Sequence, residues 1–300
     1  MNIKILDSWL REFIKTKASA KQISDYLSLT SISVERLEKY KNDFVYDIEV
    51  TTNRPDLMSV IGIASEASAV LPQFDIAATY VTPHVKKFKQ EDNLTIYIKN
   101  DSSLVNRICA AILEVKMGES PPHVKERLET SGIRSLNNIV DVTNYVMREI
   151  GHPVHAFDYD RLTTKKLIVR ESKKGEKITT LDGKVYILPG GDIVADNGEG
   201  EIIDLLGIMG TQNSVVTNDT KRILLFTDNN QPYHIRKTSM FLGIRSEAAV
   251  LNEKGIDPRK ALDALLAGIE LYYKIADAKL VSKIIDIYPN IHKEKRLAVD

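Results

Sequence analysis

The sequence is poor in features that mark several classes of protein. Its 300 residues contain one cysteine, Cys109, which excludes an internal disulfide and fits a reducing compartment. Lys and Arg together number 41, as do Asp and Glu, so the net charge lacks the basic excess of a dedicated nucleic-acid binder. Cys109 stands in a run that is apolar on both alternating faces, which favours a buried core residue over a reactive thiol.

Long apolar runs are absent too. The start, from Met1 to Lys4, opens no continuous apolar stretch, so we expect no signal peptide. No stretch reaches the roughly 18 apolar residues that a membrane-spanning helix needs. With 43% hydrophobic residues the chain can still bury sizeable cores, and we expect a soluble cytoplasmic protein with about two domains.

The common short motifs of catalysis are also missing. There is no phosphate-binding loop, no Gly-x-Ser-x-Gly, no His-Glu-x-x-His and no cysteine pair. His152, His155 and Asp158 have the spacing of metal ligands, but Pro153 fixes this segment as a loop, where histidines are usually ordinary polar residues. We therefore expect no metal site.

The apolar pattern predicts an α+β fold, with a small helical N-terminal domain followed by a mixed domain. Residues 9–14 and 23–27 have helical spacing, residues 46–50 alternate like a half-buried strand, and residues 57–71 form a helix rich in small side chains. A polar, Lys-rich stretch over about residues 82–93 makes the best linker.

Beyond the linker the sequence predicts strands mixed with helices. Helices are expected after Ser120, over residues 138–150, and from Pro232 and Pro258, while Asp182-Gly183 predicts a tight hairpin. The predicted strands cover residues 94–98, 107–116, 167–170, 177–181, 184–188, 192–196, 201–208 and 280–287.

Several longer motifs occur together and in order. From Asn53 to Glu66 the chain reads Asn-Arg-Pro-Asp-Leu-x-Ser-x-x-Gly-Ile-Ala-x-Glu. The others are Ser120-Pro121, Gly132–Met147, Glu149–Asp158, Gly175-Glu176, Thr180–Gly183, Gly207–Gly210 and Gly255–Pro258. By these motifs, which cover most of residues 45–260, the chain resembles the β subunit of phenylalanyl-tRNA synthetase.

The resemblance implies a division into domains. Residues 1–78 correspond to the first small domain of the family, 79–92 to a linker, 93–288 to the module that hydrolyses mischarged tRNA, and 289–300 to the start of a following domain. The expected partners are the catalytic α subunit, in a heterotetramer, and tRNA(Phe). No cofactor is expected in this chain. ATP and Mg²⁺ belong to the complete enzyme, whose aminoacylation site lies outside these residues.

The function that the resemblance implies is hydrolytic editing in support of phenylalanylation. A pocket shaped for phenylalanine rejects tyrosine, which adds one hydroxyl, by only about a hundredfold. A second site that hydrolyses tyrosyl-tRNA(Phe) supplies the remaining accuracy. Because an aminoacyl ester is already activated, positioned water and a stabilised oxyanion can suffice without a covalent nucleophile.

Three positions match residues that line the editing pocket of the family. Thr143, Asn144 and His155 are the expected catalytic groups: Asn144 can donate and accept hydrogen bonds, and His155 can orient water or a ribose hydroxyl. Taken without the resemblance, Thr143 is a helix residue facing the core, and the other two are ordinary polar caps or loop residues.

Five further positions form the expected substrate side of this pocket. Gly207 and Gly210 match glycines that let backbone N–H groups approach the substrate, and Ala248 matches a small residue beside the aromatic ring. Phe226 stands where the family usually has a glutamate that accepts the tyrosine hydroxyl. Asp228 lies two residues on, on the same face of a strand, and is the candidate to replace that glutamate.

Two other departures from the family pattern lie close to the expected pocket. Thr211 replaces a usual second glycine, and Leu251 begins a Leu-Asn-Glu segment in place of Arg-Phe-Glu. Together with Phe226 they motivate an alternative function, a module that has lost editing and is kept for subunit assembly and tRNA placement. A third alternative is a free-standing RNA-binding or trans-editing protein.

The N-terminal domain departs from the family as well. Many bacterial members insert a tRNA-binding domain after the first helices, but the stretch from Ser33 to Asn53 has no room for it. Contact with tRNA would then fall to patches such as Lys173, Lys174 and Lys177, whose alternative interpretation is a solvated strand edge.

Overall fold

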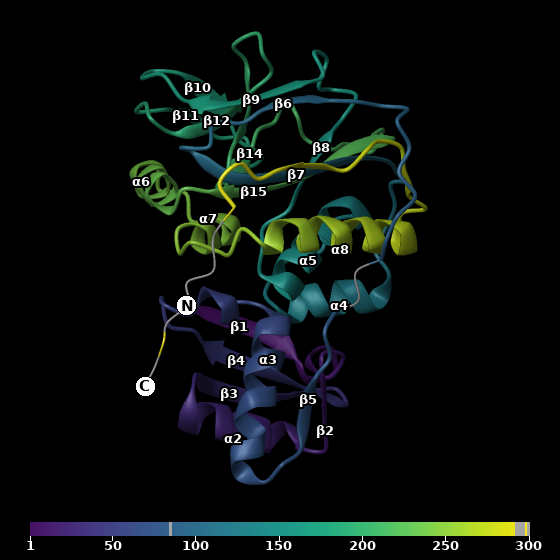
Figure 1. Cartoon of the computed structure of the whole chain (residues 1–300), viewed down its shortest axis with the longest axis vertical. Helices are drawn as coiled ribbons and strands as arrows, with labels where there is room; N and C mark the ends of the chain where they lie inside the picture. Colours follow the sequence, from purple (N-terminus) through teal and green to yellow (C-terminus); the bar gives the residue numbers. More distant parts are fainter. Residues whose placement is uncertain (84–85, 292–297, 299–300) are drawn as a thin grey trace.

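The computed structural model describes residues 1–83, 86–291 and 298, which form a small N-terminal unit and a larger unit stacked on it (Figure 1). Irregular chain connects the two units in the place of the predicted linker. Residues 84–85 of that linker, and 292–297 and 299–300 of the predicted tail, lie outside the described residues. Among the described residues, no helix combines the length and the apolar character needed to cross a bilayer.

The N-terminal unit contains a sheet as well as helices. Its elements are β1 (Asn2–Leu6), α1 (Asp7–Leu10), β2 (Ile14–Thr16), α2 (Ala20–Thr30), β3 (Ser33–Tyr40), β4 (Asp43–Glu49), α3 (Val60–Val70) and β5 (Ala78–Tyr80). The predicted strand, β4, is the centre of an antiparallel sheet in the order β1-β4-β3. The α+β class is confirmed. The first domain, predicted to be helical with one strand over residues 46–50, contains two further strands, β1 and β3, which flank β4.

The first predicted helix is shorter than its apolar spacing suggested. α1 ends at Leu10, and Ile14 instead begins β2, where it pairs with Tyr80 of β5. Trp9, Leu10 and Ile14 are all buried, as the pattern required. Over so few residues, helical spacing does not distinguish one helix from a helical turn followed by a strand, and pairing with a distant segment decided the outcome.

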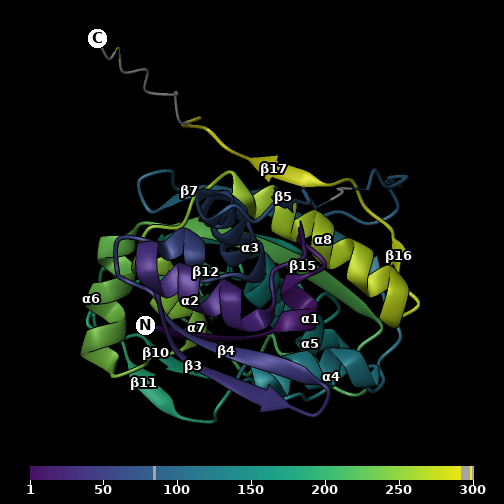
Figure 2. The same cartoon turned by 90° about the horizontal axis from the view of Figure 1, so that it is seen from below.

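The larger unit has three layers (Figure 1). Helices α5 and α8 pack on one face of a central antiparallel sheet, β16-β7-β15-β8, and a second sheet, β14-β13-β12-β9-β6, packs on the other. Strand β17 also pairs with β7 and lies on the outer side of the molecule (Figure 2). The elements are β6 (Tyr97–Lys99), β7 (Val105–Glu114), α4 (Pro122–Thr130), α5 (Asn138–Ile150), β8 (His155–Asp158), β9 (Lys166–Glu171), β10 (Lys177–Thr179), β11 (Val185–Ile187), β12 (Ile193–Asp196), β13 (Ile202–Leu205), β14 (Met209–Gly210), β15 (Arg222–Asn230), α6 (Pro232–Leu242), α7 (Glu247–Asn252), α8 (Lys260–Ile275), β16 (Lys279–Leu280) and β17 (Ile285–Ile287).

Strand β7 is buried on both faces, as its continuous apolar sequence predicted. Cys109 faces the helical layer, whereas Ile108 and Ala110 face the second sheet. The Cys109 thiol is free and fully buried, and burial raises its pKa to about 12, which confirms a core residue. The predicted hairpin is confirmed too, since β10 and β11 pair around Gly183, whose φ is 77°.

Helix α5 has the predicted bounds and is fixed at both ends. The Asn137 side chain accepts hydrogen bonds from the backbone N–H groups of Ile139 and Val140, and Gly151, with φ 79°, ends the helix. Asp141, fully buried in the first turn, accepts hydrogen bonds from Ser120 Oγ at 2.6 Å and Ser135 Oγ at 2.5 Å. The start of α5 is therefore tied to the chain that leads into α4.

One hydrophobic core continues from the N-terminal unit onto α4 and α5 of the larger unit. The rings of Trp9 and Tyr145 pack at a centroid distance of 4.5 Å, tilted by 33°, and Val124 and Leu128 of α4 are fully buried in the same cluster. The two units are thus joined by a shared core and not by the linker alone.

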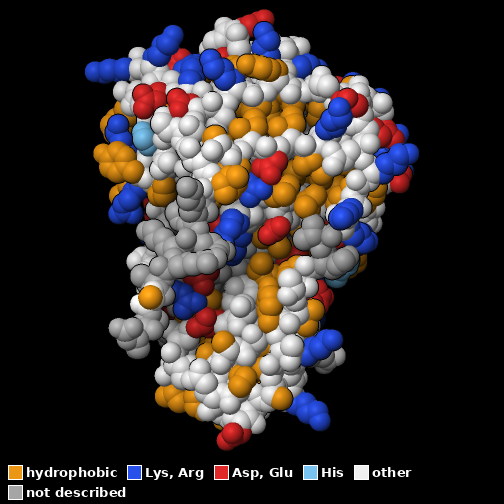
Figure 3. Space-filling view, in the orientation of Figure 1, with side chains coloured by type: hydrophobic (Ala, Val, Ile, Leu, Met, Phe, Trp, Pro, Cys, Tyr) orange, Lys and Arg blue, Asp and Glu red, His pale blue; other side chains and the backbone are white. Residues whose placement is uncertain are grey.

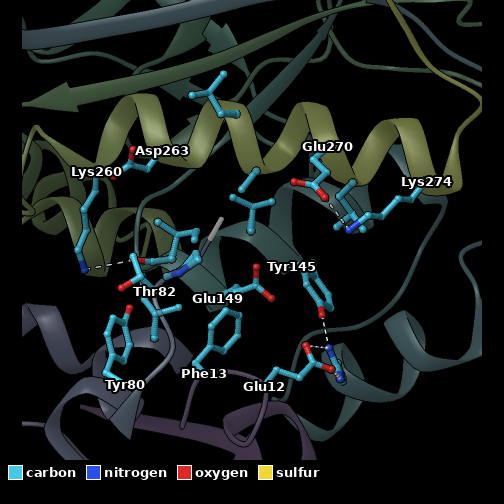
Figure 4. A pocket seen from close by; sticks show the side chains of 18 of the residues that line it. Glu12, Phe13, Tyr80, Thr82, Tyr145, Glu149, Lys260, Asp263, Glu270 and Lys274 are labelled. Carbon is cyan, nitrogen blue, oxygen red and sulfur yellow. Dashed lines mark hydrogen bonds and ion pairs between the residues drawn. The ribbon is translucent and has the colours of Figure 1, made fainter. Parts of the chain in front are cut away.

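A cavity of about 940 Å³ lies at this junction (Figure 4). Polar contacts join its walls: Trp9 Nε1 donates to Glu149 Oε2 at 2.9 Å, and Lys260 Nζ donates to the Ile150 carbonyl at 3.2 Å. Figure 4 shows the Glu149 carboxylate pointing from α5 into the cavity, and burial raises its pKa to about 6. None of the predicted site residues lines this space, so we interpret it as the junction of the units.

The buried carboxylate of Asp141 yields a first prediction. Asp141→Asn should lower the free energy of unfolding by about 2–3 kcal/mol, because the amide turns two donor hydrogens toward hydroxyl and N–H donors. Denaturant unfolding of the variant and of the exposed Asp219→Asn control measures the difference. An equal stability of the two variants would contradict this role of Asp141.

A second prediction concerns pH and the junction. A carboxyl group whose pKa is higher in the folded state stabilises the fold at low pH, and this contribution is lost as pH rises through the folded pKa, here about 6. Glu149→Gln stays neutral and can still accept from Trp9. Its melting temperature should therefore match that of the wild type near pH 4 and exceed it above pH 6, whereas Glu199→Gln, at an exposed turn, should show no such divergence.

Candidate functional site

A second cavity, of about 320 Å³, opens between α5, β8, the β13–β14 loop and α7. This volume lies at the small end of the roughly 300–1,000 Å³ typical of small-molecule sites. It brings together segments far apart in the sequence. The predicted site residues that line it are Thr143, Asn144, His155, Gly207, Gly210, Asp228 and Ala248.

Phe226 is the predicted residue that the structure does not bring to the cavity wall. It lies opposite His155 in the β15–β8 pairing, and its side chain is fully buried in the layer between the two sheets. Its ring meets Phe157 edge-on at 5.7 Å, and Phe157 in turn meets the His155 ring at 4.4 Å. Phe226 thus packs behind the cavity wall, and the prediction that it lies on the substrate side of the pocket is wrong.

The other two departures from the family do not fill the cavity either. Thr211 is buried, and its hydroxyl donates to the Ile203 carbonyl at 2.6 Å. Leu251 packs into the core shared by the two units. Neither side chain lines the cavity, so these substitutions leave its volume open.

His155 begins β8 and presents a neutral ring to the cavity. Burial lowers the pKa of His155 to about 4, so the ring is uncharged at neutral pH. Its Nε2 atom is buried and has no hydrogen-bond partner among the described residues. A neutral imidazole can accept a hydrogen bond at one nitrogen and donate at the other, which suits the orientation of a water molecule or a hydroxyl.

Two glycines let the backbone approach the cavity. A Cβ added at Gly210 would lie 2.7 Å from His155 Cε1, so any side chain there would push the ring away. Gly207 has φ +69°, and an added Cβ would meet Asn230 Nδ2 at 2.5 Å. The Gly207 carbonyl accepts from Asn252 Nδ2 at 3.1 Å, which anchors this loop to α7.

Thr143 and Asn144 come from consecutive positions of α5. Thr143 is 8% exposed, and its hydroxyl donates to the Val140 carbonyl at 2.7 Å, so only its lone pairs remain for a ligand. Asn144 is half-buried on the cavity wall and carries both a donor and an acceptor. The structure places both residues at the cavity, and their catalytic roles remain predictions.

Asp204 is a lining residue that the sequence analysis missed. It lies in β13 opposite Gly210 of β14 and is 5% exposed, as is Asp228. Burial raises the pKa of Asp204 well above its usual range, with a further contribution from Asp228, and burial raises the pKa of Asp228 to about 6. In the sequence, Asp204 is the one acid inside the apolar run 202–208, and this is the signal that marks it.

The possible metal ligands do not converge. His152 is fully buried, and its Nδ1 atom lies 2.9 Å from the Pro153 carbonyl, whereas Asp158 accepts from Thr220 Oγ1 at 2.6 Å. Among the described residues, no three His, Cys, Asp or Glu side chains are grouped so that they could hold a metal ion.

The lysines suggested for tRNA contact are all exposed. Lys173 and Lys174 lie in the turn before β10, and Lys177 begins that strand. On the face drawn in Figure 3, basic and acidic side chains are interspersed without a large area of one sign. The exposure of these lysines agrees equally with a solvated edge and with a binding patch.

Comparison with known proteins extends this description. The family model of the B3/4 domain matches residues 105–277. The β subunit of phenylalanine–tRNA ligase from Thermotoga maritima is 39% identical over 274 residues, covering 89% of this chain and 33% of that protein. The corresponding subunit from Dehalococcoides mccartyi strain CBDB1 is 40% identical over 259 residues, covering 84% of this chain and 31% of that protein.

The chain therefore spans about a third of the length of the curated relatives that it matches. Among solved structures, an N-terminal fragment of the phenylalanyl-tRNA synthetase β subunit from Pyrococcus horikoshii aligns with 95% of this chain and 79% of that chain. The TM-score of this alignment is 0.45, and the sequence identity is 15%. The family and relatives agree with the resemblance expected from the motifs, and the chain belongs to the B3/4 domain family.

Proposed function

We propose that this chain is the editing part of a phenylalanine–tRNA ligase β subunit and hydrolyses tyrosyl-tRNA(Phe). The observation that carries the proposal is the convergence of Thr143, Asn144 and His155 with Gly207 and Gly210 on one cavity of suitable size. The relatives, β subunits of phenylalanine–tRNA ligases, supply the ligase context. In this proposal the partners are the catalytic α subunit and tRNA(Phe), and ATP and Mg²⁺ act at an aminoacylation site outside this chain.

The proposed reaction needs water and a stabilised oxyanion. The water oxygen bonds to the ester carbonyl carbon, the bond from that carbon to the ribose oxygen breaks, and the ribose oxygen takes up a proton. Tyrosine and tRNA(Phe) are released. The neutral His155 ring can orient the water, and the Asn144 amide can stabilise the oxyanion.

The alternative function is a module that keeps the fold for assembly and tRNA placement without editing. It is favoured by Phe226, since an apolar ring occupies the position where the family has a hydroxyl acceptor. Against it, Phe226, Thr211 and Leu251 all lie off the cavity wall and leave the space open. The two functions differ in one measurable property, the hydrolysis of tyrosyl-tRNA(Phe).

The third prediction tests that property in the complete ligase. The enzyme should hydrolyse tyrosyl-tRNA(Phe) much faster than buffer does, and His155→Ala should slow this hydrolysis by about a hundredfold, the low end for loss of a group that assists proton transfer. Phenylalanylation should be unchanged, because the cavity is separate from aminoacylation. If hydrolysis by the wild type equals the buffer rate while phenylalanylation is intact, the editing proposal fails and the alternative holds.

The fourth prediction uses the contact of Gly210 with the histidine ring. Gly210→Ala should displace the His155 ring and lower the rate of tyrosyl-tRNA(Phe) hydrolysis by about a hundredfold, the usual effect of a 1 Å misplacement. The matched control is Gly118→Ala, since an added Cβ there meets its nearest atom at 3.8 Å. Equal hydrolysis rates in the two variants would show that the position of the ring does not matter.

A further inference from the structure

The outer face of helix α6 carries exposed aromatic side chains. Tyr233 is 75% exposed, Met240 59% and Phe241 67%. Steps of three or four residues separate positions 233, 237, 240 and 241, so these side chains lie on one face, along about 12 Å of the helix axis. Large apolar side chains that lie together on a surface usually mark an interaction site.

The same face is basic. Arg236 and Lys237 lie between the two aromatic residues, and α6 contains no acidic residue. A Cβ added at Gly191 would lie 3.6 Å from Lys237 Nζ. A Cβ added at the preceding Gly190 would lie 3.1 Å from the backbone nitrogen of Lys174, so this lysine, one of those suggested for tRNA contact, is close to α6. Figure 3 shows apolar and basic side chains next to each other at the place of α6, on the left of the view.

Nearby acids offset only part of this charge. The Glu253 carboxylate, 1% exposed, is surrounded by three bases: Arg245 at 2.7 Å, Lys254 at 3.2 Å and Arg236 at 3.5 Å. Glu171 lies 3.7 Å from His234. With Lys174 and Lys237 included, bases outnumber acids around α6, and the surface attracts phosphate groups.

The helix lies beside the candidate site. Its buried side meets the Gly207 loop, since a Cβ added at Gly207 would lie 2.9 Å from Ile235 Cδ1. Its C-terminal end leads within a few residues to Ser246 and Glu247, which line the cavity at the start of α7. The Glu247 side chain is 53% exposed and marks the rim of the cavity there. A polynucleotide whose esterified end enters the cavity therefore has the outer face of α6 within reach.

The combination of rings and basic side chains favours RNA over a protein partner. Nucleobases stack on aromatic side chains whatever their sequence, and the phosphates between them pair with cations. At about 3.4 Å per nucleotide, the length of this face matches three or four nucleotides. The centre of a protein–protein interface is instead depleted of lysine, whereas Lys237 lies midway between Tyr233 and Phe241.

From these observations we infer that the outer face of α6 binds the single-stranded 3′ end of tRNA. Nucleobases stack on the rings of Tyr233 and Phe241, and the phosphates between them lie beside Arg236 and Lys237. The inference rests on the proposed editing function, since the same 3′ end carries the ester that enters the cavity. It adds a binding surface outside the cavity, with Lys174 at its border.

The first test measures steady-state hydrolysis of tyrosyl-tRNA(Phe) by the complete ligase. In Tyr233→Ala/Phe241→Ala, KM should rise by roughly ten- to a hundredfold with kcat unchanged, because stacking on an aromatic ring contributes to binding and not to the chemical step. Hydrolysis of 3′-tyrosyl-adenosine, which has no preceding nucleotides, should not change, and neither should the KM of phenylalanylation. Both side chains are exposed, so the melting temperature should be that of the wild type. Tyr97→Ala, at an exposed aromatic residue of β6, is the matched control.

The second test isolates the phosphate contact. Lys237→Gln should lower the slope of log KM against log salt concentration by about 0.7, the contribution of one phosphate contact on a single strand. Lys99→Gln, at an exposed base on the same strand as Tyr97, should leave the slope unchanged. An equal slope in the two variants would mean that Lys237 contacts no phosphate and would overturn the inference.

The third test does not depend on hydrolysis. In the complete ligase, p-benzoylphenylalanine replaces Tyr233, or Tyr97 as the control, and is photocrosslinked to tRNA(Phe) labelled in its 3′ strand. An adduct between position 233 and the single-stranded 3′ end supports the inference. If the wild type does not hydrolyse tyrosyl-tRNA(Phe) and this adduct still forms, the proposed editing function alone fails.

The remaining outcomes overturn the inference. An adduct of position 233 with the α subunit or with a second copy of this chain would identify α6 as a protein interface. An adduct with another part of tRNA, no adduct, or a wild-type KM in the Tyr233→Ala/Phe241→Ala variant would mean that this face does not bind the 3′ end.

Discussion

The antiparallel pairing of β15 with β7 on one side and β8 on the other is the constraint on which the rest of the structure depends. β7 and β15 are buried between the helical layer and the second sheet, so nearly every side chain on them packs against another layer. The same pairing sets the register of His155 against Phe226 and directs Asp228 to the cavity. A shift by one residue would turn each of these side chains to the opposite face.

At the cavity wall, glycine backbone lies directly against neighbouring side chains. Gly210 has no room for a Cβ beside the His155 ring, and the Gly207 loop is held to α7 through Asn252. Two buried polar atoms of this wall, His155 Nε2 and Asp204 Oδ1, have no hydrogen-bond partner among the described residues. The His155 ring and the buried carboxyl groups of Asp204 and Asp228 make part of this wall polar.

The motifs predicted the family, the bounds of α5 and the residues that meet at the cavity. They did not predict β1 and β3. In β3 a register shift between Val34 and Arg36 breaks the alternation, and in β1 the alternation of Ile3 and Ile5 spans too few residues to stand out. They also misplaced Phe226. The family pattern gave the position of Phe226 along its strand. Whether a buried side chain reaches the cavity depends on the layer behind it. Here Phe157 contacts both the Phe226 ring and the His155 ring and fills the space between them.

The sequence by itself determined the α+β class, the central apolar strand, the capped helix α5 and the family, because each of these follows from local pattern or collinear motifs. Only the tertiary structure decided that Asp204 and Asp228 line the same cavity and that Thr211 and Leu251 do not. The physical reason is that burial and pairing between distant strands decide which side chains reach the cavity. Neither can be read from spacing along one chain.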